Sequence, residues 1–181
     1  SPMAGNPINL GTGNKYQHEY DYSSADSFPL IFERHYNSDS PSTASLGHYW
    51  RGTYDRHIAV YEVGKGKSKT QAADVYHANG KVYTFTLTNG LWQGEPDVAN
   101  QLIKTVDGWR YLLKNNQIEE YDLTGKLLTL LDRNGRTQQL SYNSANQVIQ
   151  VSSDFGPLLN FNYNSSGLLA SMIDSANNTY Q

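Results

Sequence analysis

Apolar and polar residues alternate in short stretches through the C-terminal third of the chain, as they do in β-strands that bury one face. The stretches are in phase with Tyr121, Tyr142 and Tyr163, which follow one another at intervals of 21 residues. Two sets of apolar positions repeat at the same interval: Leu128, Ile149 and Ala170, and two residues further on Leu130, Val151 and Met172. We expect successive repeats to stack the positions of the first set into one continuous core.

Turn-forming residues separate these stretches at two places in each repeat. The first turn contains Asp122 and Gly125, then Asn143 and Asn146, then Asn164 and Gly167. The second turn contains Asp132 and Gly135, then Asp154 and Gly156, then Asp174 and Asn177, with Asp154 one place out of register. Each repeat is therefore predicted to be a β-hairpin, and the segment a tandem array of hairpins.

The preceding segments carry strand and turn signals without a strict repeat. Asn79-Gly80, Asn89-Gly90 and Asp107-Gly108 mark turns in the middle of the chain, and such dipeptides suit tight hairpins. No long amphipathic helix is evident. We predict an all-β fold of strongly twisted antiparallel hairpins, against or across which the N-terminal third packs. The predicted segments are a β-rich opening domain at 1–60, irregular hairpins at 61–120 and repeats at 121–181, with the last repeat truncated.

Composition and charge exclude several classes of function. The net charge is −3, so the sequence offers no basic surface to neutralise the phosphates of nucleic acid. The chain has no cysteine, which excludes disulfides and thiolate metal sites. No run approaches the 18 apolar residues that indicate a membrane span. We see no Sec signal in the first residues.

The five histidines do not show a recognised catalytic or zinc-binding spacing. Glu33 and His35 would share one face of a strand, because side chains alternate between faces, and Ser38 is close to them in sequence. A packing or turn role is favoured over catalysis. We therefore predict no catalytic, cofactor-binding or metal-binding residue and expect the chain not to be an enzyme.

The repeated aspartates and tyrosines each have two interpretations. Asp122, Asp132, Asp154 and Asp174 either accept hydrogen bonds from backbone N–H groups in their turns or form a calcium ladder, and one carboxylate per turn favours the first. The repeated tyrosines either form a structural ladder across the sheet or a stack that binds sugar rings. Their regular interval favours the ladder.

The repeats resemble those of the YD-repeat, or Rhs-repeat, family, in which a Tyr-Asp or Tyr-Asn pair precedes a short turn that ends in Gly. Tyr121-Asp122, Tyr142-Asn143 and Tyr163-Asn164 carry the resemblance. The sequence departs from the pattern where Asn replaces Asp in two copies and where Asn146 replaces Gly.

The N-terminal part resembles the domain that opens many Rhs proteins. The residues that match, in order, are Gly5, Asn6, Pro7, Gly13, Asn14, Asp21, Tyr22, Arg34, Tyr36, Asn37, Ser38, Gly47 and Trp50. Together the two resemblances cover nearly the whole chain.

The resemblance implies a structural role. Rhs proteins are similar to the C subunits of Tc toxins and to teneurins in having a spiralling β-sheet that closes into a hollow shell. In bacterial members the shell holds a C-terminal toxin until delivery, often by type VI secretion. The expected partners are the remaining repeats and toxin of a longer parent chain, with secretion-system proteins as further partners. The expected location is outside the producing cell.

A second interpretation is a binding module for a glycan or a protein at the cell surface, using exposed Tyr and Asn side chains. A hydrolase is a third, and no constellation of residues supports it. A glycan array or a pull-down with secretion components would separate the binding module from the structural segment.

The last hairpin leaves an unpaired sheet edge, which favours pairing with another chain. We therefore predict that the protein forms homodimers through this edge. Light scattering over a concentration series, together with far-ultraviolet circular dichroism, should show a β spectrum and a mass that rises with concentration. A monodisperse monomer at high concentration would contradict the prediction.

Overall fold

The computed structural model describes residues 3–4, 8–9, 12–40 and 43–181. Strands connected by turns make up these residues, with one short 3-10 helix, so the predicted all-β class is confirmed. The chain divides into two compact units, each built from separate stretches of sequence. Unit 1 contains Ser1–Asp55, Ala78–Gly80 and Ser141–Gln181, and unit 2 contains Arg56–His77 and Lys81–Leu140.

Unit 1 joins the N-terminal strands to the last hairpins. A three-stranded antiparallel sheet has β4 (Ile31–Asn37) between β3 (Tyr16–Ser23) and β7 (Trp50–Gly52). Two short pairs accompany it, β1 (Met3–Ala4) with β2 (Ile8–Asn9) and β5 (Thr43–Ala44) with β6 (Gly47–His48). The hairpin strands are β17 (Val148–Ser153), β18 (Leu158–Tyr163), β19 (Leu169–Asp174) and β20 (Thr179–Tyr180), each paired with the next.

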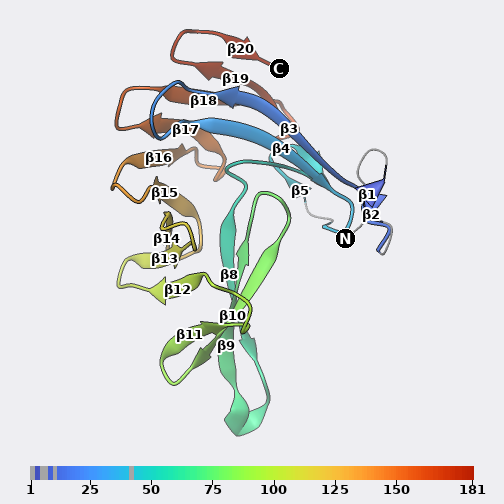
Figure 1. Ribbon diagram of the computed structural model, residues 1–181, viewed down its shortest axis with the longest axis vertical. Coiled ribbons are helices and arrows are strands. Elements are labelled where there is room, and N and C mark those ends of the chain that lie inside the picture. The colour runs from blue at the N-terminus through green and yellow to red at the C-terminus, as the bar shows by residue number, and fades with distance from the viewer. Residues whose placement is uncertain (1–2, 5–7, 10–11, 41–42) are drawn as a thin grey trace. The chain divides into compact units, whose positions relative to one another are not determined.

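Aromatic side chains join the two parts of unit 1. The ring of Phe32, on β4, lies 5.6 Å from that of Phe161, on β18, and the Tyr54 ring lies 5.9 Å from Phe161. The backbone N–H of Leu169 donates to the carbonyl of Ser45 at 2.7 Å. Strands β3 and β4 accordingly run beside β17 to β20 (Figure 1). The N-terminal strands thus pack against the last hairpins.

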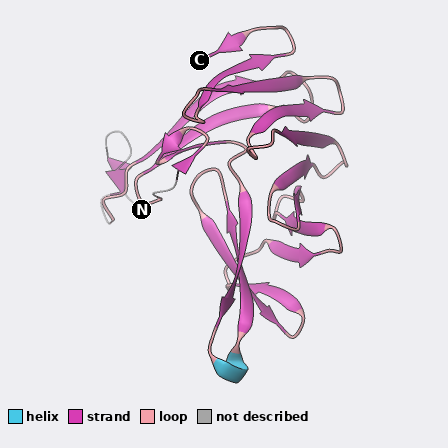
Figure 2. Cartoon of the chain, turned by 180° about the vertical axis from the view of Figure 1, so that it is seen from behind, coloured by secondary structure: helices cyan, strands magenta, loops and turns pink. Residues whose placement is uncertain are grey.

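Unit 2 contains two successive antiparallel arrays. The first is formed by β8 (His57–Val63), β9 (Thr70–Tyr76), β10 (Val82–Thr88) and β11 (Leu91–Gly94), in sequence order. The 3-10 helix, Gly66–Ser68, connects β8 to β9 (Figure 2). The second is formed by β12 (Gln101–Lys104), β13 (Gly108–Leu112), β14 (Ile118–Asp122), β15 (Leu127–Leu131) and the first part of β16 (Thr137–Tyr142), again in order. The last two residues of β16, Ser141 and Tyr142, belong to unit 1.

The predicted core positions were wrong for one of the two repeating sets. Leu128 and Ile149 are 37% and 39% exposed, and Ala170 is also exposed. In the second set, Val151 and Met172 are buried. In the second and third repeats the core position is therefore two residues later than we expected, whereas in the first repeat Leu130 is half-buried and Leu127 is buried.

A β-bulge lies at two of the three exposed positions, Leu128 and Ala170. The ladder between β14 and β15 skips Leu128, and the ladder between β18 and β19 skips Ala170, because the register shifts after Glu120 and after Asn162. A bulge places two residues opposite one and interrupts the alternation of faces. Strict period-two reading of the sequence cannot detect such an extra residue.

Gly125 marks a close approach between a hairpin turn and strand β8 within unit 2. The N–H of Ile58 donates to the Gly125 carbonyl at 2.9 Å. A Cβ atom at Gly125 would lie 1.8 Å from the carbonyl oxygen of Ile58. Gly135 has a similar left-handed backbone, with φ of +78° against +87°, but a Cβ atom there would meet open space. Alanine at Gly135 would introduce backbone strain alone, whereas alanine at Gly125 would introduce backbone strain together with a steric clash.

Gly125→Ala is expected to destabilise the protein far more than Gly135→Ala. The second change should cost about 1 kcal/mol, the strain of a left-handed non-glycine residue. Gly125→Ala adds a collision between the new Cβ atom and the carbonyl oxygen of Ile58, which can be relieved only by moving β8 away from the turn. Urea denaturation of both variants measures the difference. Equal, small losses of stability would show that the approach of Gly125 to Ile58 is unimportant.

Candidate functional site

Side-chain oxygens close the repeat turns by one recurring arrangement. In each case the Oδ1 atom accepts hydrogen bonds from the backbone N–H groups two and four residues later, at 2.8–3.0 Å. The residues that do so are Asp122, Asp132, Asn143, Asn164 and Asp174. Asp and Asn are interchangeable here because each provides the acceptor oxygen.

The backbone follows the same course in these turns. The N–H of the first residue donates to the carbonyl four residues on, and the N–H of the fourth residue donates back to the carbonyl of the first. The fourth residue has a positive φ in every case: Gly125, Gly135, Asn146, Gly156, Gly167 and Asn177. Asn tolerates this region better than other non-glycine residues, which explains Asn146 and Asn177.

Ser153, which the sequence analysis did not single out, occupies the position predicted for Asp154. The N–H of Ser153 donates to the carbonyl of Pro157 at 2.9 Å, and the N–H of Gly156 returns to the Ser153 carbonyl at 3.2 Å. The Ser153 hydroxyl accepts from the N–H of Phe155 at 3.4 Å. Asp154 lies at the second position of the turn, which accounts for its shift in register.

The turn carboxylates are engaged by protein groups on both oxygens. Asp174 Oδ2 accepts from the Asn178 side chain at 2.9 Å and from the Tyr180 hydroxyl at 3.0 Å. Asp132 Oδ2 accepts from Arg136 Nε at 2.7 Å. These bonds use the lone pairs that a calcium ion would need. The arrangement therefore favours turn closure over a calcium ladder.

Charge adds to this closure. Burial opposes ionisation of Asp132, but hydrogen bonds from the Arg136 guanidinium and from the N–H groups of Arg136 and Asn134 outweigh it, and the pKa of this carboxyl falls to about 2. The pKa of Asp174 is lowered chiefly by the hydrogen bond from the Asn178 side chain. The carboxylates thus stabilise the turns in their ionised form.

The repeat tyrosines also have partners within their own units. Tyr121, in unit 2, is buried and donates its hydroxyl hydrogen to Glu119. Tyr163, in unit 1, is half-buried and donates to the carbonyl of Val148 at 2.9 Å. Burial raises the pKa of both phenols. Tyr142 is half-buried on β16. The partners of Tyr121 and Tyr163 favour the structural ladder over a stack for sugar rings.

A buried polar cluster in unit 2 was not anticipated from the sequence. Glu119 is 2% exposed and accepts from the guanidinium of Arg56 and from the hydroxyl of Tyr121. Nearby, Tyr111 contacts His77 Nε2 at 3.1 Å and accepts from the Asn100 side chain at 2.6 Å. The sequence signal for this cluster was that Glu119 stands two residues before Tyr121, so that both lie on the same face of the strand. Each charge in the cluster has a partner, as burial requires.

The opening-motif residues lie mostly around β3 and β4. Arg34 forms a bidentate pair with Asp21 at 2.6 and 2.7 Å, and Asp21 is the bulge residue of β3 beside Tyr22. The Arg34 guanidinium lies 5.8 Å from the centre of the Trp50 ring. This cluster links all three strands of the sheet.

The remaining motif residues stabilise adjacent loops. Ser38 Oγ donates to Asn14 Oδ1 at 3.0 Å and accepts from the Lys15 N–H, so it is not arranged as a nucleophile for His35. The Asn37 side chain donates to the Asn79 carbonyl. The other residues are Gly13 in an exposed turn, Tyr36 against Trp50, and Gly47 close to Leu168. Gly5, Asn6 and Pro7 lie outside the described residues.

Asp55 is a further residue that the motif reading missed. Its carboxylate accepts from the N–H of Gly52 at 2.7 Å and from the hydroxyl and N–H of Ser45. Burial raises its pKa, in opposition to these hydrogen bonds. Asp55 thereby fixes the loop whose Ser45 carbonyl binds Leu169.

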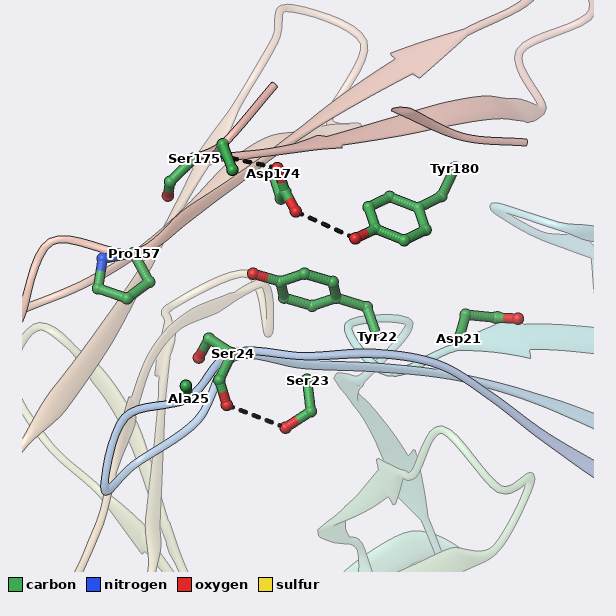
Figure 3. A pocket seen from close by; sticks show the side chains of 10 residues that line it. Asp21, Tyr22, Ser23, Ser24, Ala25, Pro157, Asp174, Ser175 and Tyr180 are labelled. Atoms are coloured by element: carbon green, nitrogen blue, oxygen red, sulfur yellow. Dashed lines mark hydrogen bonds between the residues drawn. The ribbon is translucent and has the colours of Figure 1, made fainter. Parts of the chain in front are cut away.

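An open pocket of about 520 Å³ lies in unit 1 between β3 and the last hairpins. Figure 3 shows Tyr22 and Tyr180 facing each other across it, with their rings 5.5 Å apart in an edge-to-face arrangement. Its two carboxylates, Asp21 and Asp174, are held by Arg34 and by the turn described above. Both acids of the pocket therefore have structural partners.

The N-terminal part of the chain matches the model of a known protein family. Residues 5–85 match the model of a family described as a domain of unknown function, DUF6531. The match covers less than half of the chain and ends within β10, so the repeat hairpins lie beyond it. No curated protein matches the chain. Among the described residues, no helix has the length and apolar character needed to cross a membrane.

Acid should destabilise the protein through the turn carboxylates. A carboxyl whose pKa is lower in the folded chain contributes stability above its unfolded value, and this stability is lost as the pH falls through the folded value. For Asp132 the loss runs from about pH 4 to about pH 2. The urea midpoint should fall over this range and fall less steeply in Asp132→Asn. Asp107→Asn, in an exposed turn of unit 2, serves as the control. An identical acid profile for Asp132→Asn and the unsubstituted chain would contradict this role.

Proposed function

We propose that this chain is a non-catalytic structural segment of the β-shell of a bacterial Rhs protein. The shell encloses a C-terminal toxin and helps to deliver it out of the producing cell, with a type VI-like apparatus as the route. The remaining repeats and the toxin of the parent chain are its partners. The resemblance of the repeat and opening motifs to the Rhs family supports this proposal.

The recurring turn closure is the observation that carries the proposal. A hairpin whose two ends are closed alike can be followed by another hairpin of the same kind, and each adds strands to the edge of the last. Such growth produces an extended sheet from nearest-neighbour contacts, as in other repeat proteins. A sheet of this kind is suited to form the wall of the β-shell.

The chemistry of the described side chains supports the same role. Glu119, Asp132 and Asp174 are buried, and each is neutralised or hydrogen-bonded within its own unit. An acid or base for catalysis must reach a substrate. These groups instead hold the strands and turns together.

The second candidate, a binding module, rests on the pocket beside Tyr22 and Tyr180. Several serine hydroxyls, including those of Ser23, Ser24 and Ser175, line it together with the two rings. A sugar could bind there through hydroxyl groups and ring edges. Binding on a glycan array that Tyr22→Ala and Tyr180→Ala abolish would favour this function over the structural one.

Protease protection in the natural full-length protein tests the proposed function. The region C-terminal to the repeats should resist protease in the unsubstituted protein. Gly125→Ala should raise its cleavage rate by about tenfold or more, since proteolysis follows the population of the opened state. Gly135→Ala should have a much smaller effect.

Electron microscopy of the same full-length samples should show hollow, closed particles. Two results would overturn the proposal. One is cleavage of the C-terminal region as fast in the native protein as in denaturant, and the other is an open rod without an interior.

A further inference from the structure

Two histidines and a glutamate converge on one face of the N-terminal sheet. His18, on β3, is paired directly across from His35, on β4. Glu33 lies two residues before His35, so its side chain is on the same face. Its Oε2 atom is 3.2 Å from His18 Nε2 and 3.5 Å from His35 Nε2. The three ligand atoms all lie within 4.8 Å of one another.

These separations suit one metal ion. Zinc binds imidazole nitrogen and carboxylate oxygen at about 2.0–2.2 Å in tetrahedral geometry, which places neighbouring ligand atoms about 3.3–3.5 Å apart. The two distances to Glu33 fall close to this range. Nitrogen and oxygen donors in this combination are typical of zinc and similar transition-metal ions.

Tyr16 orients one of the histidines for this role. Its hydroxyl oxygen is 2.8 Å from His35 Nδ1. When the hydroxyl accepts a hydrogen bond from Nδ1–H, the proton resides on that nitrogen and Nε2 is left with the lone pair that binds a metal. Metal-binding histidines usually have such a partner on the second nitrogen.

The cluster is buried on one side and open on the other. His35 is 8% exposed, whereas the His18 side chain is 43% exposed and that of Glu33 26% exposed. The His18 and His35 rings are stacked 4.6 Å apart. Arg51, on β7, lies opposite His35 in the pairing of β4 with β7. Its guanidinium donates to the Ser40 carbonyl. An ion can therefore enter from the side of His18.

We propose that His18, Glu33 and His35 bind one Zn²⁺ ion, with water as the fourth ligand. The ion joins β3 to β4 and stabilises unit 1. Sequence spacing did not indicate this site, because the two histidines are 17 residues apart and meet only when the strands pair.

Titration of the protein with Zn²⁺, followed by calorimetry, tests the site directly. One equivalent should bind, and His18→Ala and Glu33→Gln should each weaken binding by at least about tenfold, since each removes a ligand. Tyr16→Phe should weaken it by about tenfold, the usual effect of losing a hydrogen-bond partner of a ligand. His57→Ala, an exposed histidine on β8 in unit 2, is the control and should bind as before.

A second measurement separates metal binding from damage to the fold. Saturating Zn²⁺ should raise the urea midpoint of the unsubstituted protein, because a ligand that binds only the folded state stabilises it. At the same Zn²⁺ concentration the rise should be smaller in His18→Ala, whose side chain is 43% exposed and whose circular dichroism should be unchanged. The absence of a one-equivalent site, or binding that survives both His18→Ala and Glu33→Gln, would overturn the proposal.

Discussion

The hydrogen-bonded closure of the repeat turns is the constraint on which the hairpin arrays depend. An Asx oxygen that binds the N–H groups two and four residues later, with a left-handed residue between them, permits only one strand register. A slip of one residue would turn every side chain to the opposite face. Turn chemistry therefore determines which residues form the core.

Packing follows from this fixed register. The bulges at Leu128 and Ala170 interrupt the alternation of faces next to Leu127 and Met172, which are buried. In unit 2 the same strand pattern brings Glu119 inside, where Arg56 and Tyr121 neutralise and bind it. In unit 1 it places Phe161 against Phe32. Local turns and distant contacts are consistent with each other, as expected for a uniquely folded chain.

The sequence was informative where one residue acts on its close neighbours. The all-β class and the turn positions at Asp122, Asp132 and Asp174 could be predicted because Asx and Gly residues act over four or five positions. The bulges could not, since an extra residue changes the face of a strand without changing its composition. Contacts such as Arg56 with Glu119, or His18 with His35, depend on which strands become neighbours, and that information is not present in local spacing.

The make-up of unit 1 also has a consequence during synthesis. Residues 1–55 belong with residues 141–181, and 85 residues separate the two stretches. At a translation rate of about 5–20 residues per second, about 4 to 17 seconds pass before synthesis of the partner stretch even begins. During that time Phe32 and the unpaired edges of β3 and β7 are open to the wrong neighbours. A chaperone that holds the nascent chain would not speed synthesis, but it would protect these strands until the last hairpins emerge.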